Sequence, residues 1–239
     1  MEWIKDPTGR FSERPHYQPE ELDIICEDLA YGVLQKRHNG RLVFPIPTDD
    51  LTVMIEQAEA DLDNYADLSE VGSSVEGVTE FFQGRKPLVR ISRDLSEKAN
   101  QENRYRTTLT HECSHVKLHG FLWEIRFANG NLLKSKIDKQ TCKREVIESA
   151  GAYDWMEWQA NYASGAILMP LTNIKATIKQ FFFDEGSSVP KLDDESQEAW
   201  KLLNRITPQF GVSEQAARVR LIQLGVLVKG LRNQPTLWS

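Results

Sequence analysis

The stretch Thr108-Leu109-Thr110-His111-Glu112-Cys113-Ser114-His115 decides how this chain is interpreted, because it contains the pattern H-E-x-x-H. In an α-helix each residue turns by about 100°, so His111 and His115 lie on one face, one turn apart. Two imidazoles placed in this way can bind one zinc ion, and Glu112 beside them can activate a zinc-bound water. Cys113 points to the opposite side, and we interpret it as a core residue.

Composition narrows the class of protein. The 239 residues carry 29 Lys and Arg against 35 Asp and Glu, a net charge of −6, which argues against broad binding to nucleic acid. We see no apolar run of the ~20 residues that span a bilayer, and acidic residues stand where a signal peptide would be basic and then apolar. The three cysteines are widely spaced and form no C-x-x-C pair. We therefore expect a cytoplasmic protein without a membrane partner.

An open catalytic zinc site needs a third protein ligand. In metzincins this is a histidine six residues after the second one, a position that holds Phe121 here. His119 lies on the same helical face, but about 12 Å along the axis from His111 at ~1.5 Å per residue, so we exclude it as a ligand. We expect it to end the helix at Gly120 and to interact with free carbonyls there. The remaining class takes a glutamate from a later helix, and the candidates are Glu145, Glu148 and Glu157.

Glu157 is the strongest of these candidates. Glu157 and Asn161 form an E-x-x-x-N pattern, so they share one helical face. The carboxylate can bind zinc while the Asn161 carbonyl accepts a proton from the ring of a ligand histidine and fixes its tautomer. Asp154 and Glu157 also fit a capping box, in which Glu157 folds back on the backbone. The upstream histidines make us favour the ligand role, whereas Glu148 has Ala152 four positions later.

Hydrophobic periodicity predicts an α+β protein that is mainly helical, with a small sheet containing antiparallel strands. We expect strands at 78–82 and 88–91, joined by a turn, and the strand Leu88-Val89-Arg90-Ile91 is a candidate edge for binding an extended peptide. We interpret the region 131–150, which holds Cys142 and a basic cluster, as a solvated surface loop. The expected helices run from Pro19 toward Gly40, from Thr48 to Tyr65, from Arg104 to His119, and from Asp154 to Met169. The basic cluster comprises Lys134, Lys136, Lys139, Lys143 and Arg144.

The chain divides into an N-terminal arm (1–19), a main domain (20–185) and, after a polar linker at 186–196, a C-terminal segment (196–239). In that segment Trp200, Leu203 and Ile206 have helical spacing. A turn at 210–212 and a helix capped by Ser213 follow, which makes a helix-turn-helix-like arrangement. Its outward basic residues are few, so we favour packing or partner recognition over direct DNA binding.

The chain resembles the ImmA/IrrE family of zinc metallopeptidases. The resemblance rests on 108–119, containing H-E-x-x-H, on 157–170, containing E-x-x-x-N, and more weakly on 210–225. It implies His111, His115 and Glu157 as zinc ligands and Glu112 as catalytic base, in a small gluzincin-like domain. It also implies cleavage of a partner repressor that carries a helix-turn-helix. The 42 positions from His115 to Glu157 exceed the usual family spacing, and the basic loop fills this excess.

These residues together predict zinc-dependent peptide hydrolysis with one zinc ion per chain. Two neutral imidazoles and one carboxylate leave a net charge of +1 on the site, which keeps the metal a good Lewis acid. Candidates for the group that stabilises the oxyanion are Tyr153, Tyr162 and His38. The alternatives are a non-catalytic zinc-containing module that regulates by binding protein or DNA, and a zinc hydrolase with a non-peptide substrate.

Overall fold

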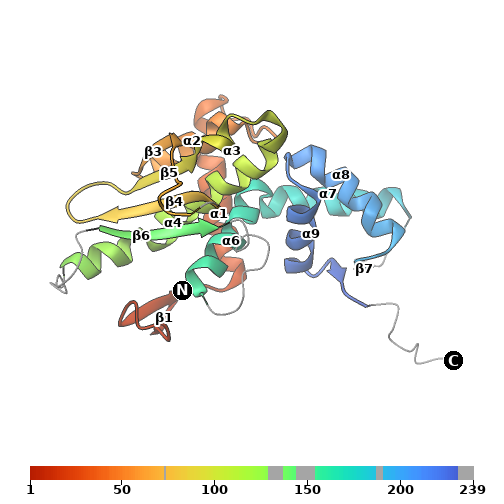
Figure 1. Cartoon of the computed structure of the whole chain (residues 1–239). Helices are drawn as coiled ribbons and strands as arrows, with labels where there is room; N and C mark the ends of the chain where they lie inside the picture. Colours follow the sequence, from red (N-terminus) through yellow and green to blue (C-terminus); the bar gives the residue numbers. More distant parts are fainter. Residues whose placement is uncertain (73, 129–136, 144–153, 187–190, 231–239) are drawn as a thin grey trace.

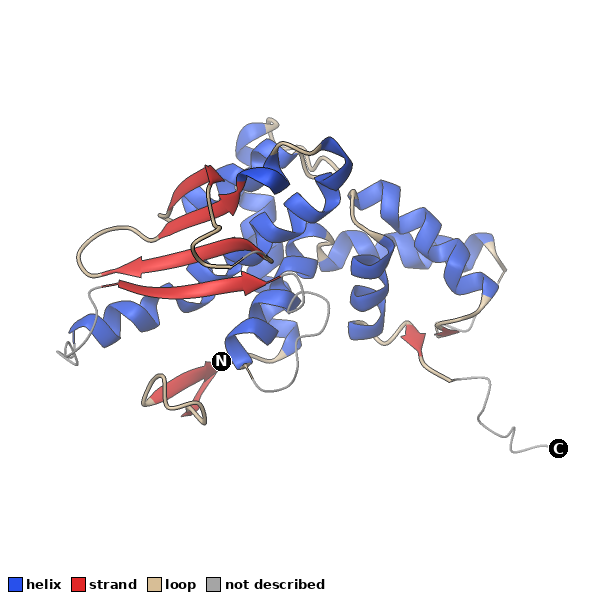
Figure 2. Ribbon diagram, viewed as in Figure 1, coloured by secondary structure: helices blue, strands red, loops and turns tan. Residues whose placement is uncertain are grey.

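The computed structural model describes residues 1–72, 74–128, 137–143, 154–186 and 191–230, and only the backbone over 137–143. A small sheet lies on one side of the central helices, and the C-terminal helices lie on the other side (Figure 1, Figure 2). Helices and both parallel and antiparallel strand pairs occur in one chain, so the expected α+β class is confirmed. No helix in the described part of the chain is long and apolar enough to cross a membrane.

The main sheet has four strands in the order β3-β5-β4-β6. Strand β5 (Leu88–Ser92) pairs in parallel with β3 (Asp61–Ala66) and antiparallel with β4 (Val75–Phe82). Both predicted strands are therefore confirmed. The prediction that Leu88-Val89-Arg90-Ile91 forms a substrate edge is wrong, because β5 has a neighbouring strand on each side. Strands β3 and β6 are the outer strands of this sheet.

The second predicted helix is too long. Helix α2 (Thr48–Gln57) ends early, Glu59 adopts a positive φ of 64°, and the chain continues as β3. Leu62 fits the apolar spacing of the helix, but it also fits a strand in which burial alternates along 61–66. Backbone pairing with β5, a contact between distant parts of the sequence, decides between these two periods.

Strand β6 (Ile137–Lys143) corrects the prediction of a solvated loop at 131–150. Its backbone pairs antiparallel with β4, with Cys142 opposite Gly77 and Lys139 opposite Glu80. The strand is therefore an integral part of the sheet. The rest of the basic cluster (Lys134, Lys136 and Arg144), together with Glu145, Glu148 and Tyr153, lies outside the described residues.

Three helices build the centre of the molecule. Helix α1 (Pro19–Arg37) begins as expected, with proline in its first turn and Glu21 accepting a bond from the Gln18 backbone N–H at 3.0 Å. Helix α6 (Trp155–Leu168) also matches, because the Asp154 side chain caps its N-terminus. A short helix α3 (Arg93–Ser96) and the 3-10 turn η1 (Ala99–Gln101) lead into helix α4 (Glu102–Ala128).

Helix α4 continues past Gly120, so the predicted end at that residue is wrong. A glycine inside a helix costs only about 1 kcal/mol. The residues beyond it gain more than that by burial: Leu122 and Trp123 are each 2% exposed, and the Trp123 ring stacks on Phe81 of β4 at 5.3 Å. Tertiary packing therefore overrides the local stop signal.

The N-terminal arm is an ordered hairpin. Strands β1 (Glu2–Lys5) and β2 (Glu13–His16) pair antiparallel, and Phe11 packs against Trp123 and Trp155. The hairpin therefore covers the part of the core where α4 and α6 lie close together.

The C-terminal helices share the main core with α1, α4 and α6. Helix α7 (Leu171–Asp184) leads to α8 (Gln197–Phe210) and α9 (Glu214–Gln223), and the short strands β7 (Leu192–Asp193) and β8 (Leu227–Val228) pair in parallel. Gly211 ends α8 with a positive φ of 60°, and Ser213 caps α9 as predicted. Leu203 and Ile206 are buried, whereas Trp200 is 59% exposed.

Two buried arginines join the C-terminal helices to the rest of the protein. Arg220 of α9 is fully buried and donates to Asp23 of α1 at 2.6 Å. Arg106 of α4 donates to the carbonyls of Phe210 and Gly211, at 3.2 Å and 2.9 Å, where α8 ends. These bonds hold α9 in a fixed position beside α6.

We predict that Asp23→Ala lowers the free energy of unfolding by about 3–5 kcal/mol, because it leaves the Arg220 charge buried without its partner. Urea unfolding followed by circular dichroism measures the change. Asp184→Ala is the control, since the Asp184–Arg205 pair is exposed and contributes at most about 1 kcal/mol. Equal effects of the two substitutions would contradict the structural role of the buried pair.

Candidate metal centre

Helices α4 and α6 bring His111, His115 and Glu157 to one point inside the protein. The Nε2 atoms of the two histidines are 3.0 Å apart. The Glu157 oxygens lie 3.2 Å from Nε2 of His111 and 3.3 Å from Nε2 of His115. Both histidines are fully buried and Glu157 is 6% exposed. The three residues predicted as ligands therefore meet.

The spacing of these atoms suits a small cation in a tetrahedral site. Zinc–nitrogen and zinc–oxygen bonds of about 2.0 Å give a distance of about 3.3 Å between any two ligands of a tetrahedron. The three measured separations of 3.0, 3.2 and 3.3 Å agree with this value. His111, His115 and Glu157 can therefore hold one metal ion without rearrangement.

Electrostatics keeps Glu157 in the form that binds metal. Burial alone would raise the pKa of the Glu157 carboxyl, but the neighbouring His115 and His111 outweigh it and lower the pKa below its usual range. The carboxylate is therefore ionised at neutral pH. The alternative in which Glu157 folds back to cap α6 is not what the structure shows, because its carboxylate lies against the two imidazoles.

Glu112 faces the sheet from α4. The hydroxyl of Thr79 in β4 donates to its Oε2 atom at 2.5 Å, and among the described residues the fully buried Oε1 atom has no hydrogen-bond partner. Burial raises the pKa of Glu112, and the nearby His111 and His115 oppose this only in part. A carboxylate with a raised pKa is a stronger proton acceptor, which suits a general base.

Gly77 makes this close approach of α4 and β4 possible. A Cβ atom at Gly77 would lie 2.5 Å from Oε1 of Glu112 and 2.9 Å from Cγ2 of Thr108. Gly77 and Thr79 were missed by sequence reasoning. A glycine inside a strand is a weak signal of close approach by another segment, but it does not say which one.

His119 is not at the end of α4, and its predicted contact with free carbonyls is wrong. The residue is fully buried inside the helix. Its Nδ1 atom lies 3.1 Å from Nδ1 of His115, and its Nε2 atom lies 3.0 Å from Oε1 of Gln159 in α6. Its exclusion as a ligand agrees with this geometry, because His119 contacts the side of the His115 ring that faces away from the ligand cluster. The role of Gln159 was missed.

Two of the predicted oxyanion donors have other partners. The Tyr162 hydroxyl donates to Asp23 at 3.1 Å, and burial raises the pKa of Tyr162 to about 12. Nε2 of His38 lies 2.6 Å from Asp50 of α2. These bonds hold helices together and do not involve the ligand cluster, and the suggested catalytic role stays a prediction for both. Cys113 is 1% exposed and packs in the core as expected.

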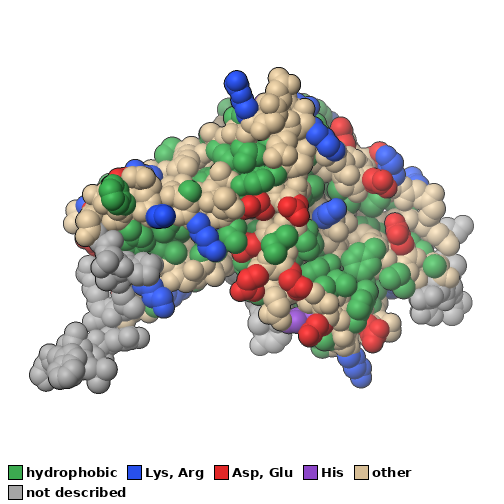
Figure 3. All heavy atoms as spheres, turned by 180° about the vertical axis from the view of Figure 1, so that it is seen from behind, with side chains coloured by type: hydrophobic (Ala, Val, Ile, Leu, Met, Phe, Trp, Pro, Cys, Tyr) green, Lys and Arg blue, Asp and Glu red, His purple; other side chains and the backbone are tan. Residues whose placement is uncertain are grey.

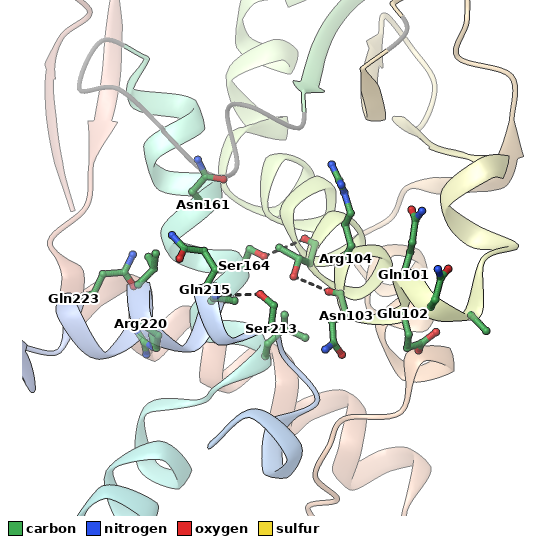
Figure 4. Close-up of a pocket in the computed structure, with 17 residues that line it drawn as sticks. Gln101, Glu102, Asn103, Arg104, Asn161, Ser164, Ser213, Gln215, Arg220 and Gln223 are labelled. Atoms are coloured by element: carbon green, nitrogen blue, oxygen red, sulfur yellow. Dashed lines mark hydrogen bonds between the residues drawn. The ribbon is translucent and has the colours of Figure 1, made fainter. Parts of the chain in front are cut away.

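A cleft with a volume of about 560 Å³ lies between the first turns of α4, the middle of α6 and α9. Figure 4 shows Asn161 and Ser164 on α6, Gln215 and Gln223 on α9, and the segment Gln101–Arg104 on the other side. Asn161 lies one helical turn after Glu157, whereas His111, His115 and Glu157 themselves do not line this cleft. The prediction that the Asn161 carbonyl holds a ligand ring stays a prediction.

Comparison with known proteins adds no relatives to this description. A scan against models of protein families finds no match for the chain, and a search of curated proteins finds none either. The conclusions on function therefore rest on the residues and on the geometry of the site.

We predict that Gly77→Ala lowers the free energy of unfolding by about 1–3 kcal/mol, because the new methyl group overlaps Glu112 and Thr108. Thermal and urea unfolding measure the loss. Gly32→Ala in α1 is the control: its Cβ meets nothing within 4 Å, so it should be neutral or stabilise by up to about 1 kcal/mol. A Gly77→Ala protein as stable as Gly32→Ala would show that the close approach is not constrained.

We predict one zinc ion per chain in the purified protein and its loss in His115→Ala and Glu157→Ala, since each variant removes one of three ligands. Elemental analysis by mass spectrometry after dialysis measures the metal content. His16→Ala, in the N-terminal hairpin, is the matched control and should keep the metal. Retention of a full equivalent of zinc by both ligand variants would disprove the site.

Proposed function

We propose that this protein is a zinc-dependent endopeptidase that hydrolyses a peptide bond in a partner protein. The observation that carries the proposal is the convergence of two imidazole nitrogens and a carboxylate beside a buried glutamate that is oriented by Thr79. The nitrogen and oxygen donors suit zinc, and three protein ligands leave one position of a tetrahedron open, as catalytic sites require.

Zinc in such a site supplies Lewis acidity and makes a water molecule nucleophilic at neutral pH. The side chains of this chain have distinct parts in the reaction. Glu112 takes the proton of the attacking water at Oε1 while Thr79 holds Oε2, and it then passes the proton to the leaving amine. Burial raises the pKa of Glu112, which favours its uptake of the proton.

The cleft that Asn161 lines supports a peptide as substrate. Its walls carry side-chain amides from four elements: Asn100 and Gln101 of η1, Asn103 of α4, Asn161 of α6, and Gln215 and Gln223 of α9. A carboxamide both donates and accepts hydrogen bonds, as does each peptide group of an extended chain. Binding by strand addition would use an outer strand, β3 or β6, since β5 is inside the sheet.

The resemblance to the ImmA/IrrE family supplies the substrate class, a transcriptional repressor or antitoxin with a helix-turn-helix. We include this class in the proposal, together with a cytoplasmic location, which fits the buried thiols of Cys26 and Cys113. The gluzincin-like fold also remains part of the proposal.

The rival, a zinc-containing module that binds DNA, has less support. Arg218 of α9 bonds to Glu214 and to the Asp194 carbonyl, and Arg220 is buried against Asp23. These guanidinium groups are therefore used within the protein. Figure 3 shows acidic and basic side chains intermixed on the face opposite to that of Figure 1, with acidic ones across its centre, whereas binding of DNA phosphates needs a basic stripe.

We predict that Glu112→Gln keeps its zinc and loses about 10²–10⁴-fold in cleavage rate, because the amide cannot accept the water proton. Mass spectrometry of protein N-termini compares cells expressing the wild type with cells expressing the variant. New N-termini that depend on Glu112, in a protein with a helix-turn-helix, are the expected result.

The control is Glu124→Gln, the same substitution at an exposed position of the same helix, which should cleave like the wild type. Unchanged cleavage by Glu112→Gln would contradict the proposed mechanism. A wild type that holds zinc but produces no new N-termini would favour the binding-module alternative.

A further inference from the structure

A chain of hydrogen-bonding groups connects the N-terminal hairpin to the candidate metal centre. The Gln159 amide nitrogen donates to the Pro15 carbonyl of β2 at 3.1 Å. Oε1 of Gln159 lies 3.0 Å from Nε2 of His119, and Nδ1 of His119 lies 3.1 Å from Nδ1 of His115. The other nitrogen of His115, Nε2, faces His111 and Glu157. Four groups from β2, α6 and α4 therefore form one continuous path.

The chemistry of the groups determines where every proton in this path lies. A main-chain carbonyl only accepts, so the Gln159 amide must turn its NH₂ group toward Pro15 and its oxygen toward His119. That oxygen also only accepts, so Nε2 of His119 carries a proton. A neutral imidazole carries a single proton, so with Nε2 protonated the Nδ1 atom of His119 is bare and accepts across its 3.1 Å contact with His115. Nδ1 of His115 must then carry the proton.

We propose that Pro15, Gln159 and His119 are positioning residues of the metal centre, and that the N-terminal hairpin sets the tautomer in which His115 binds metal. With its proton on Nδ1, a neutral His115 has a bare Nε2 atom, which is the atom that faces the other two ligands. The outer partner of a metal-binding histidine fixes both the tautomer and the orientation of its ring. The inference rests on the proposed metal centre but not on peptidase activity.

Asp6 holds the hairpin in the position that this role needs. It is 4% exposed and accepts bonds from the indole N–H of Trp155 at 3.0 Å and from the backbone N–H groups of Thr8 and Phe11. The Trp155 ring contacts His119 edge-on, with ring centroids 5.5 Å apart. The same anchor therefore fixes the hairpin to α6 and covers the His119 ring.

Nitrogen-15 NMR of the histidine rings tests the proposal in the unmodified protein, with and without Zn²⁺. We expect His119 in the Nε2–H tautomer in both samples and His115 with its proton on Nδ1 in the zinc sample. A His119 ring protonated on Nδ1, or a His115 ring bound to zinc through Nδ1, would overturn the proposal. This measurement needs neither a variant nor a substrate, so its result is independent of whether the protein is a peptidase.

Zinc affinity, measured by competition with a chromogenic chelator, tests the same residues by substitution. We expect Gln159→Leu and His119→Leu to bind zinc about 10–100-fold more weakly, as is usual when the outer partner of a ligand is removed. His119→Asn should recover part of the loss, because its side-chain oxygen can accept from Nδ1 of His115. Gln180→Leu, at an exposed position of α7, is the matched control.

Asp6→Ala tests the hairpin itself, because the Asp6 side chain bonds to Thr8, Phe11 and Trp155, none of which belongs to the path. Glu13→Ala, at an exposed position of β2, is the control. We expect weaker zinc binding for Asp6→Ala alone. Folded Gln159→Leu and His119→Leu proteins that bind zinc within two-fold of the wild type would overturn the proposal. Where a variant does not fold, as judged by circular dichroism, the NMR measurement decides.

Discussion

The packing of α4 against α6 is the contact on which the rest of this structure depends. It places three polar groups, those of His111, His115 and Glu157, around one buried point. Polar groups and charges buried in this way cost free energy unless partners satisfy them. Close packing of the two helices is possible because small residues face each other, with the hydroxyl oxygens of Thr110 and Ser164 2.7 Å apart. A bound cation would satisfy all three of these metal-binding side chains at once.

The other elements support this contact from three sides. Strand β4 brings Thr79 and Gly77 against Glu112, so that its carboxylate is held by the sheet and not only by its own helix. The C-terminal helices are fixed by Arg106 and Arg220, and α9 forms one wall of the cleft that Asn161 lines. The N-terminal hairpin covers the third side, where Asp6 accepts a bond from Trp155 and the Pro15 carbonyl accepts one from Gln159. Segments far apart in the sequence thus contribute to one site.

Much of the site followed from local spacing. The helical repeat put His111 and His115 on one face, and the same repeat made Glu157 and Asn161 a pair. The wrong predictions concern a segment whose apolar spacing fits both a helix and a strand, and a helix whose local stop signal was overridden by tertiary packing. Leu62 suited both a helix and a strand, and pairing with β5 selected the strand. Gly120 suggested a helix end, but burial of Leu122 and Trp123 extended α4 beyond it. The Leu88–Ile91 strand was identified correctly, yet its place inside the sheet was not.

The sequence by itself determined the donor atoms and their positions along each helix, because these depend only on residue type and on the rise and turn of the backbone. Tertiary structure alone decided which groups meet: Thr79 with Glu112, His119 with Gln159, and Gln159 with the Pro15 carbonyl. Each of these pairs joins segments separated by 33 or more positions. Such pairs form only when burial of the shared core brings the segments together. A local sequence pattern does not encode which distant segment will be the partner.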